Sequence, residues 1–188
     1  MCGVIGYVGD RDIESILLVG LERLSYRGYD SCGIATLQDG ELGCWKAVGK
    51  VHELVKLLKP LTVKGSVGIG HTRWATHGEV NELNAHPHMT SRKKIAIVHN
   101  GIVENYLSIK NDLIKEGHIF RTETDTEVIV HLIEKYFEDN LLDAVEKAVL
   151  ELVGSFAICV IAENSSDSIV FCRKGSPLVI GKGMNENY

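Results

Sequence analysis

The sequence contains few of the residues and segments that would prevent it from forming a folded core. Only 3 prolines occur in 188 residues, and apolar side chains make up 45% of the chain. This composition excludes a collagenous or low-complexity protein. No apolar run approaches the roughly 20 residues that a membrane-spanning helix needs, and the first residues lack the basic and apolar regions of a secretory signal. We therefore expect one soluble, cytoplasmic domain over residues 1–188, with no membrane partner.

Basic residues are not in excess over acidic ones, and the cysteines show no spacing typical of disulfides or zinc sites. Lysine and arginine total 20 against 25 acidic residues, which gives a net charge of −5. A nucleic-acid partner is not expected, because its electrostatic footprint is missing. The cysteines number 5 and contain no Cys-x-x-Cys pair. An odd number at wide spacing argues against a disulfide framework or a zinc knuckle and favours a reducing compartment.

Apolar periodicity indicates strands and helices that occur in blocks. Short apolar runs predict strands over 3–8, 33–37, 42–48, 67–70, 95–98, 156–162 and 168–172. Helical spacing predicts helices over 13–24, 54–58, 102–114, 128–137 and 141–152. Asp39-Gly40 is typical of a tight hairpin turn. This block pattern favours an α+β layered fold over a doubly wound parallel sheet.

Cys2 is the sharpest chemical feature. Removal of Met1 would leave a thiol and a free α-amino group on one residue, and an amine that titrates near 7.7–8.0 can take the proton of a thiol near neutral pH. The alternative is a small buried residue beside the initiator methionine, since cysteine is commonly buried.

Two further segments carry groups suited to binding a substrate. Asn100 and Gly101 follow an apolar run, where a strand is expected to end, and their amide groups could hold an oxyanion; an ordinary Asn-Gly turn is the alternative. Arg73 could grip a carboxylate with its fork while Trp74 covers the site. Alternatively, Arg73 forms a surface ion pair and Trp74 anchors a core.

Five of the eight histidines lie between positions 71 and 99, namely His71, His77, His86, His88 and His99. We expect no metal there, because His86-Pro87-His88 lacks a helical i, i+4 spacing and no cysteine or carboxylate lies at ligand spacing.

A capping motif precedes the helix expected over 128–137. Thr124 with Glu127 fits a capping box at the start of that helix, and Asp125 between them is a fixed carboxylate that could also hold an ammonium group. The two roles do not exclude each other.

Together these segments resemble the glutaminase domain of glutamine-dependent amidotransferases with an N-terminal nucleophile, and among them the glucosamine-6-phosphate synthase family. The resemblance covers essentially the whole chain and rests on six motifs in family order: Cys2-Gly3-Val4-Ile5-Gly6, Tyr26-Arg27-Gly28-Tyr29-Asp30-Ser31, His71-Thr72-Arg73-Trp74-Ala75-Thr76-His77-Gly78, Asn84-Ala85-His86-Pro87-His88, His99-Asn100-Gly101-Ile102 and Glu123-Thr124-Asp125-Thr126-Glu127.

The resemblance implies a role for each matched residue. Cys2 would attack the side-chain amide of L-glutamine with its own amine as the base, release ammonia and form a thioester that water hydrolyses. Asn100 and Gly101 would form the oxyanion hole. Arg73 would bind the α-carboxylate of the substrate, and Asp125 its α-ammonium group.

The resemblance also implies a fold and supporting residues. Trp74, Thr76 and His77 lie in the family's mobile loop over glutamine, and Trp74 would gate ammonia transfer. Supporting positions are Arg27, Gly28 and His86. The implied fold is a four-layer αββα sandwich of the N-terminal-nucleophile hydrolase type, with no cofactor and no metal. Cys32 stands where the family more usually has alanine, which we expect to affect packing only.

Residues 1–188 would then be a glutaminase domain whose C-terminal end is missing and which lacks the sugar-isomerase domains that bind fructose 6-phosphate. In the full-length enzyme, an expected homodimer, the ammonia would convert fructose 6-phosphate to glucosamine 6-phosphate in hexosamine biosynthesis. Three alternatives remain: another amidotransferase, such as the phosphoribosylamine-forming enzyme; a self-processing hydrolase or protease, although only Met1 precedes the nucleophile; and a non-catalytic glutamine-binding module.

Overall fold

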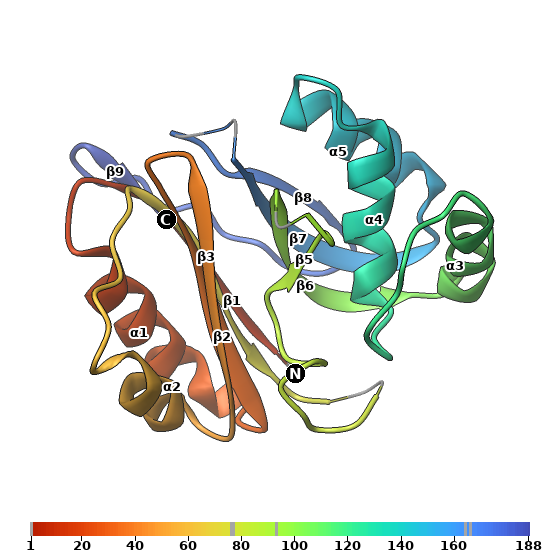
Figure 1. Cartoon of the computed structure of the whole chain (residues 1–188). Coiled ribbons are helices and arrows are strands. Elements are labelled where there is room, and N and C mark those ends of the chain that lie inside the picture. Colours follow the sequence, from red (N-terminus) through yellow and green to blue (C-terminus); the bar gives the residue numbers. More distant parts are fainter. Residues whose placement is uncertain (1, 76–77, 93, 164, 166) are drawn as a thin grey trace.

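The computed structural model describes residues 2–75, 78–92, 94–163, 165 and 167–188. Two antiparallel sheets lie face to face at the centre of the molecule (Figure 1). The first sheet has the order β3-β2-β4-β1-β9 and comprises β1 (Gly3–Gly9), β2 (Ser31–Gln38), β3 (Glu41–Val48), β4 (Val67–Arg73) and β9 (Glu186–Asn187). The second sheet has the order β5-β6-β7-β8 and comprises β5 (His88–Met89), β6 (Ile95–Val103), β7 (Gly154–Ala162) and β8 (Val170–Lys174).

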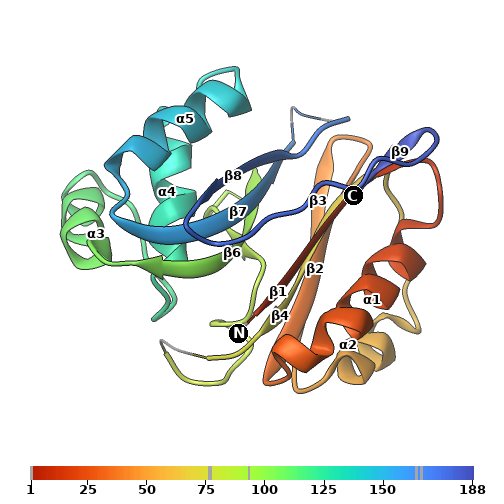
Figure 2. The same cartoon turned by 180° about the vertical axis from the view of Figure 1, so that it is seen from behind.

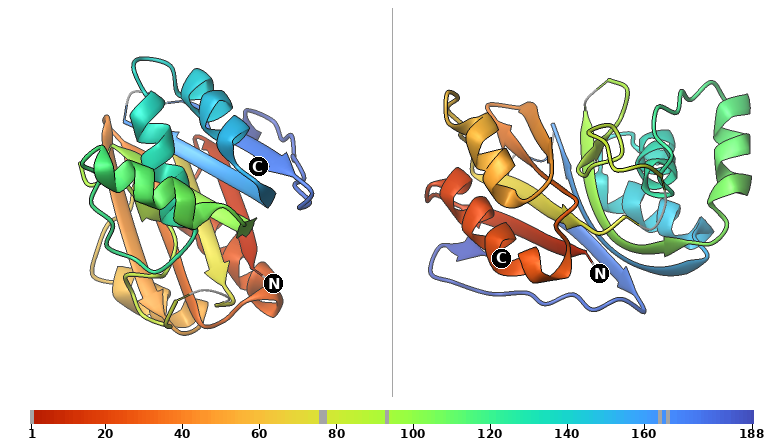
Figure 3. Two further views of the ribbon diagram at one scale, coloured as in Figure 1. Left: turned by 90° about the vertical axis from the view of Figure 1, so that its right-hand side faces the viewer. Right: turned by 90° about the horizontal axis from the view of Figure 1, so that it is seen from below.

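Helices cover the outer face of each sheet. The first sheet is covered by α1 (Ile13–Leu24) and α2 (Val51–Leu58), and a short 3-10 helix, η1 (Ser25–Arg27), follows α1. The second sheet is covered by α4 (Thr126–Tyr136) and α5 (Leu141–Glu151), and α3 (Tyr106–Lys115) packs beside α4. The view from below, on the right of Figure 3, shows the same order of helices, sheet, sheet and helices. The expected four-layer αββα arrangement is confirmed.

Side-chain alternation along the inner strands fills three separate cores. Ile34 of β2 packs under α1 and α2, whereas its neighbour Ala35 faces the second sheet. In β6, Ile97 packs under α4 while Val98 faces the first sheet. Because successive strand residues point to opposite faces, a strand between two layers buries both, which explains the continuous apolar runs in these strands.

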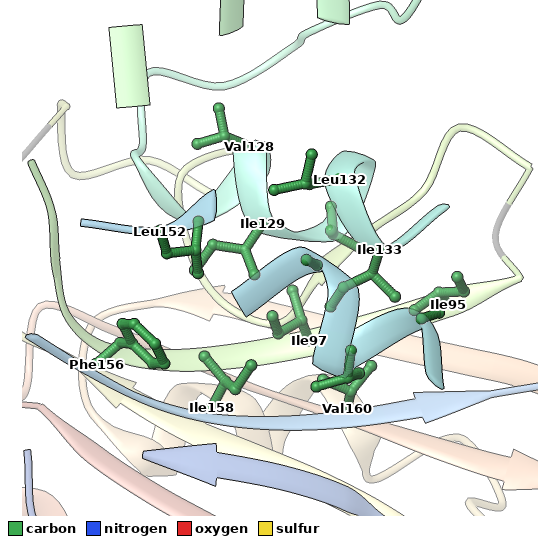
Figure 4. Close-up of a cluster of buried hydrophobic side chains, with 14 of the residues drawn as sticks. Ile95, Ile97, Val128, Ile129, Leu132, Ile133, Leu152, Phe156, Ile158 and Val160 are labelled. Carbon is green, nitrogen blue, oxygen red and sulfur yellow. The ribbon is translucent and has the colours of Figure 1, made fainter. Parts of the chain in front are cut away.

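The core beneath α4 and α5 is the largest of the three. It is drawn in Figure 4, where side chains from α4 meet those of β6 and β7, including Ile129, Ile97 and Ile158, each fully buried. Figure 2 shows the molecule from behind, with the segment between β8 and β9 crossing from the second sheet back to the first. β9 pairs with β1 at the edge of that first sheet.

Most of the expected elements are present, with one substantial correction. The hairpin around Asp39-Gly40 joins β2 to β3 as expected. The helix expected to start at Ile102 is wrong in its first turn, because β6 continues to Val103 and α3 begins only at Tyr106. Two strands of two residues, β5 and β9, were not predicted.

A helix that crosses a membrane must be both long and apolar. In the described parts of the chain, no helix combines the length and the apolar character needed to cross a bilayer.

Candidate active site

Cys2 lies where β1 begins, beside the end of β4. The pairing of Gly3 with Thr72 across the two strands brings the start of the chain next to Trp74. The backbone N–H of Trp74 donates to the Cys2 Sγ at 3.2 Å, and the thiol lies 3.5 Å from the Trp74 carbonyl oxygen. The register of the first sheet therefore holds the sulfur in place.

The electrostatic surroundings of Cys2 keep it in the thiol form. Burial raises the pKa of the Cys2 thiol, and the hydrogen bond from Trp74 and the charge of Arg73 only partly offset that rise. A thiol of this kind needs a base to become a nucleophile.

A second residue reaches Cys2 from the opposite sheet. The Asn100 Nδ2 of β6 donates to the Cys2 carbonyl oxygen at 3.0 Å. The Nε of Arg27, in η1, donates to the same oxygen at 3.0 Å. Two donors from different layers thus fix the backbone of the candidate nucleophile, and the site lies where the two sheets meet.

Gly101 occupies a position that only glycine fits. Its φ of +147° is rarely adopted by other residues, and a Cβ there would lie 2.0 Å from the Ser155 carbonyl oxygen. Asn100 and Gly101 pair with Ala157 and Phe156 of β7. The expectation that they follow the strand in a turn is therefore wrong, since both lie inside β6.

Arg73, at the end of β4, is buried at 4% exposure. Its Nη1 and Nη2 donate to the carbonyl oxygens of Glu79 and Gly78 at 3.1 and 3.3 Å. The alternative of a surface ion pair is therefore wrong. Gly28 packs against its backbone, where a Cβ would lie 2.7 Å from the Arg73 carbonyl.

Trp74 is 44% exposed, and its ring meets Tyr29 edge to face at 5.2 Å. The alternative that Trp74 anchors a core is therefore wrong. The next amide, Ala75 N–H, donates to Asp30, whose other oxygen accepts from the Ser31 hydroxyl. Asp30 thus holds the segment that carries Trp74, and sequence reasoning missed this role.

Asp125 precedes α4 and is buried, and its Oδ2 accepts from the Val103 N–H at 2.8 Å. The expected capping box is wrong, because no side chain caps this helix. Instead, Glu127 turns back and accepts from the N–H groups of Arg121 and Thr122. Despite the opposing effect of burial, the neighbouring His131 ring and the hydrogen bonds from this loop lower the pKa of Glu127 to about 2.

Four of the histidines between 71 and 99 form a buried cluster behind the pocket. His71 and His86 stack with ring centroids 4.0 Å apart, and His88 meets His86 edge to face. Burial lowers the pKa of His71 to about 3 and that of His86 well below its ordinary value. Each ring has at least one nitrogen facing a polar group, such as the Thr126 hydroxyl 2.9 Å from the His99 Nδ1. The His71 Nδ1 and the His99 Nε2 have no hydrogen-bond partner among the described residues. These rings are therefore neutral near pH 7.

One small pocket gathers most of the predicted residues. It is lined by Cys2, His71, Arg73, Trp74, His86, His99, Gly101, Thr124, Asp125 and Thr126. The other supporting residues, Arg27 and Gly28, lie behind it against Cys2 and Arg73. Thr76 and His77, expected in a loop over the substrate, lie outside the described residues. The arrangement offers a thiol, a cation and a carboxylate around one space, which suits an amino acid with a reactive side chain.

Comparison with known proteins agrees with the resemblance to glutamine amidotransferases. The sequence model of the glutamine amidotransferase domain matches residues 59–186. The glutamine–fructose-6-phosphate aminotransferases (isomerizing) of Thermosynechococcus vestitus and Aquifex aeolicus are each 52% identical to this chain, over 99% and 100% of it, but over only 30% and 32% of their own lengths. The chain thus spans about a third of these relatives.

A solved structure shares the fold. The glutamine phosphoribosylpyrophosphate amidotransferase of Bacillus subtilis superposes with a TM-score of 0.85 over 98% of this chain and 40% of its own, at 30% identity. This likeness confirms the expected sandwich of the N-terminal-nucleophile hydrolase type. Because the matched region 59–186 is most of the chain, the chain belongs to the glutamine amidotransferase domain family.

Proposed function

We propose that this chain hydrolyses the side-chain amide of L-glutamine to glutamate and ammonia. The observation that carries the proposal is the meeting of the Cys2 thiol with a pocket that also presents Arg73 and Asp125. A guanidinium and a carboxylate match the two charges of an α-amino acid, and the thiol lies where its side chain would react.

The chemistry follows from the state of the thiol. The Cys2 sulfur attacks the carboxamide carbon of glutamine while the thiol proton passes to the Cys2 α-amine. The carbon–nitrogen bond then breaks, the ammonium form of that amine returns the proton to the leaving nitrogen, and ammonia departs. Water hydrolyses the resulting γ-glutamyl thioester to glutamate and restores the thiol.

The α-amine is a better base than the neighbouring imidazoles. An α-amine titrates near 7.7–8.0, whereas the pKa of His71 is lowered to about 3. A base this weak cannot take the proton from a thiol whose pKa is raised. The mechanism therefore requires removal of Met1, since an acylated nitrogen is not basic.

Asn100 and Gly101 would bind the oxyanion that forms when the Cys2 sulfur attacks the carboxamide carbon. The Asn100 side-chain amide reaches Cys2, and Gly101 lines the pocket. One such donor is typically worth about 3–4 kcal/mol of transition-state stabilisation. Arg27 and Gly28 would act by holding the backbones of Cys2 and Arg73.

We propose further that residues 1–188 supply ammonia within a longer protein that converts fructose 6-phosphate to glucosamine 6-phosphate. Support comes from the relatives of about half identity over the full chain, which are named for fructose 6-phosphate. The phosphoribosylpyrophosphate enzyme is the second candidate, at 30% identity.

The decisive experiment measures glutamate and ammonia from glutamine with wild-type protein, Cys2→Ala and a control variant, Cys172→Ala, which changes a partly buried thiol in β8. We expect turnover in the wild type and the control, and none in Cys2→Ala. Glutamine binding without ammonia release would instead support a non-catalytic module.

Labelling with a glutamine-like electrophile, followed by peptide mapping, identifies the nucleophile directly. We expect the adduct on Cys2, and an adduct on Cys44 or Cys159 instead would contradict the assignment. Testing fructose 6-phosphate against phosphoribosylpyrophosphate with the longer protein decides the acceptor.

A further inference from the structure

A group of side chains of types that can bind a metal lies at α4, outside the candidate active site. His131 and Glu134 are three positions apart on α4, and His118 comes from the loop that follows α3. Within the part of the chain that the structure describes, this is the only set of three or more histidine, cysteine or acidic residues whose ligand atoms all lie within 4.8 Å of one another. None of the three lines the pocket at Cys2.

The three ligand atoms form a nearly equilateral triangle. The Nδ1 atoms of His118 and His131 are 3.4 Å apart, and the Glu134 Oε2 lies 3.5 and 3.2 Å from them. Ligands of a tetrahedral zinc ion, with bonds of about 2.0–2.2 Å, are separated by about 3.3–3.6 Å. The triangle therefore has the size of one face of a zinc tetrahedron.

The surroundings of the three side chains leave room for a fourth ligand, and they orient the ring of the buried histidine, His131. The side chains of His118 and Glu134 are 17% and 25% exposed, so water can reach the fourth corner. His131 is buried, and its Nε2 faces the Glu127 Oε1 at 3.7 Å. A carboxylate behind a histidine favours the proton on that nitrogen and leaves the other, here Nδ1, free for a metal.

The facing ring nitrogens also require something between them. Two imidazole nitrogens 3.4 Å apart repel each other unless a proton or a cation is shared. Despite burial, Glu127 and Glu134 raise the pKa of His131 to about 9, so a proton meets this requirement in the metal-free protein and a metal ion would displace it. Two imidazoles and one carboxylate suit Zn²⁺ better than Mg²⁺ or Ca²⁺, which prefer oxygen ligands. The nearby ammonium of Lys135 is engaged with Glu116 at 2.7 Å.

We propose that His118, His131 and Glu134 bind one Zn²⁺ ion per chain, with water as the fourth ligand. We expected no metal in this chain, because the histidines between 71 and 99 lack ligand spacing and the resemblance implies none. His118 and His131 lie 13 positions apart and meet only because the chain folds back onto α4. The ion would tie the loop after α3 to the helix that starts beside Asp125, and so stiffen one wall of the candidate active site.

The test is a Zn²⁺ titration of metal-depleted protein by isothermal calorimetry. It is carried out in a Cys2→Ser background, so that the active-site pocket offers no sulfur ligand. We expect one equivalent of Zn²⁺. His118→Ala and Glu134→Gln should each weaken binding at least tenfold, and the control His52→Ala, which changes a histidine with a 60% exposed side chain, should not.

Two further measurements keep the outcome unambiguous. Circular dichroism of each metal-depleted variant checks that it folds, and both altered ligands lie partly at the surface. Co²⁺ bound to the unaltered site should give the intense visible absorption of a tetrahedral ion without a thiolate charge-transfer band. No binding, binding that survives both ligand substitutions, or a thiolate band in the Cys2-containing protein that accounts for all bound metal would overturn the proposal.

Discussion

The His71 Nε2 lies 2.9 Å from the Asn100 Oδ1 and 3.0 Å from the His99 carbonyl oxygen. A carbonyl can only accept, so this ring nitrogen carries the hydrogen. The Asn100 oxygen must then face His71, which turns its NH₂ group toward Cys2, where it donates to another carbonyl at 3.0 Å. A buried, neutral histidine thus sets which end of the Asn100 amide faces the site.

This relationship predicts a non-additive pair of substitutions. Asn100→Ala should lower kcat for glutamine by about 10²–10³, as loss of one oxyanion donor does. His71→Phe should lower kcat by a smaller factor, because the amide is still present but no longer oriented. The double variant should be no slower than Asn100→Ala alone, since His71 acts through Asn100. Steady-state kinetics of the four proteins checks this, and multiplied losses in the double variant would show an independent role for His71.

Asp125→Asn should weaken recognition of the substrate amine while keeping the fold. An asparagine oxygen can still accept the hydrogen bond from the Val103 N–H, but the negative charge is gone. We expect KM for glutamine to rise about tenfold or more.

The matched measurement uses glutaramic acid, which is glutamine without its α-amino group. Wild-type protein should prefer glutamine strongly over this analogue, and Asp125→Asn should lose most of that preference. An unchanged preference in the variant would place the amine elsewhere.

Mass spectrometry of active protein should find Cys2 as the first residue. The pKa of the thiol is raised by burial, so the mechanism needs the free α-amine as its base. Protein that retains Met1 should bind glutamine but release no ammonia, and removal of Met1 with an aminopeptidase should restore turnover. Full turnover by protein that retains Met1 would rule out the amine as base.

The sequence predicted the layers well because burial in them is periodic. In β2 and β6 both faces are apolar, so their runs are continuous and easy to recognise. The end of β6 was missed for a physical reason. Asn100 and Gly101 interrupt the apolar run, and Ile102, which is 45% exposed, stands four positions before Tyr106 and so fits a helical period, although the pairing with β7 continues to Val103.

The sequence predicted which residues form the candidate site, but not which of them contact one another. The family motifs contained Cys2, Arg73, Asn100 and Asp125, yet no spacing rule showed that His71 orients Asn100. A usable signal existed, because His71 lies two residues after Ile69 on the face of β4 that meets the second sheet. The capping box failed because Glu127 was recruited by the loop before α4.

Stability should fall steeply as the solution is acidified. Burial lowers the pKa of His71, His86, His88 and His99 below that of a free imidazole. Unfolded, these histidines take up protons near pH 6.5, while in the folded protein they stay neutral. Their contribution to the free energy of unfolding is therefore present above pH 6.5 and is lost as the pH falls below it. Each histidine adds about 1.4 kcal/mol per pH unit to that slope once it is protonated only in the unfolded chain.

Urea unfolding between pH 7.5 and 4.5 measures the slope, and His88→Gln isolates one of the four histidines. The glutamine side chain introduced at position 88 can still reach the Thr124 hydroxyl that lies 3.2 Å from the His88 ring, but it takes up no proton. The slope of the free energy of unfolding against pH should therefore decrease by about 1.4 kcal/mol per pH unit. The control His52→Gln changes a histidine whose side chain is 60% exposed and should leave the slope unchanged. Equal slopes in wild type and His88→Gln would mean that His88 is protonated in the folded as well as the unfolded state, which would contradict the lowered pKa of this ring.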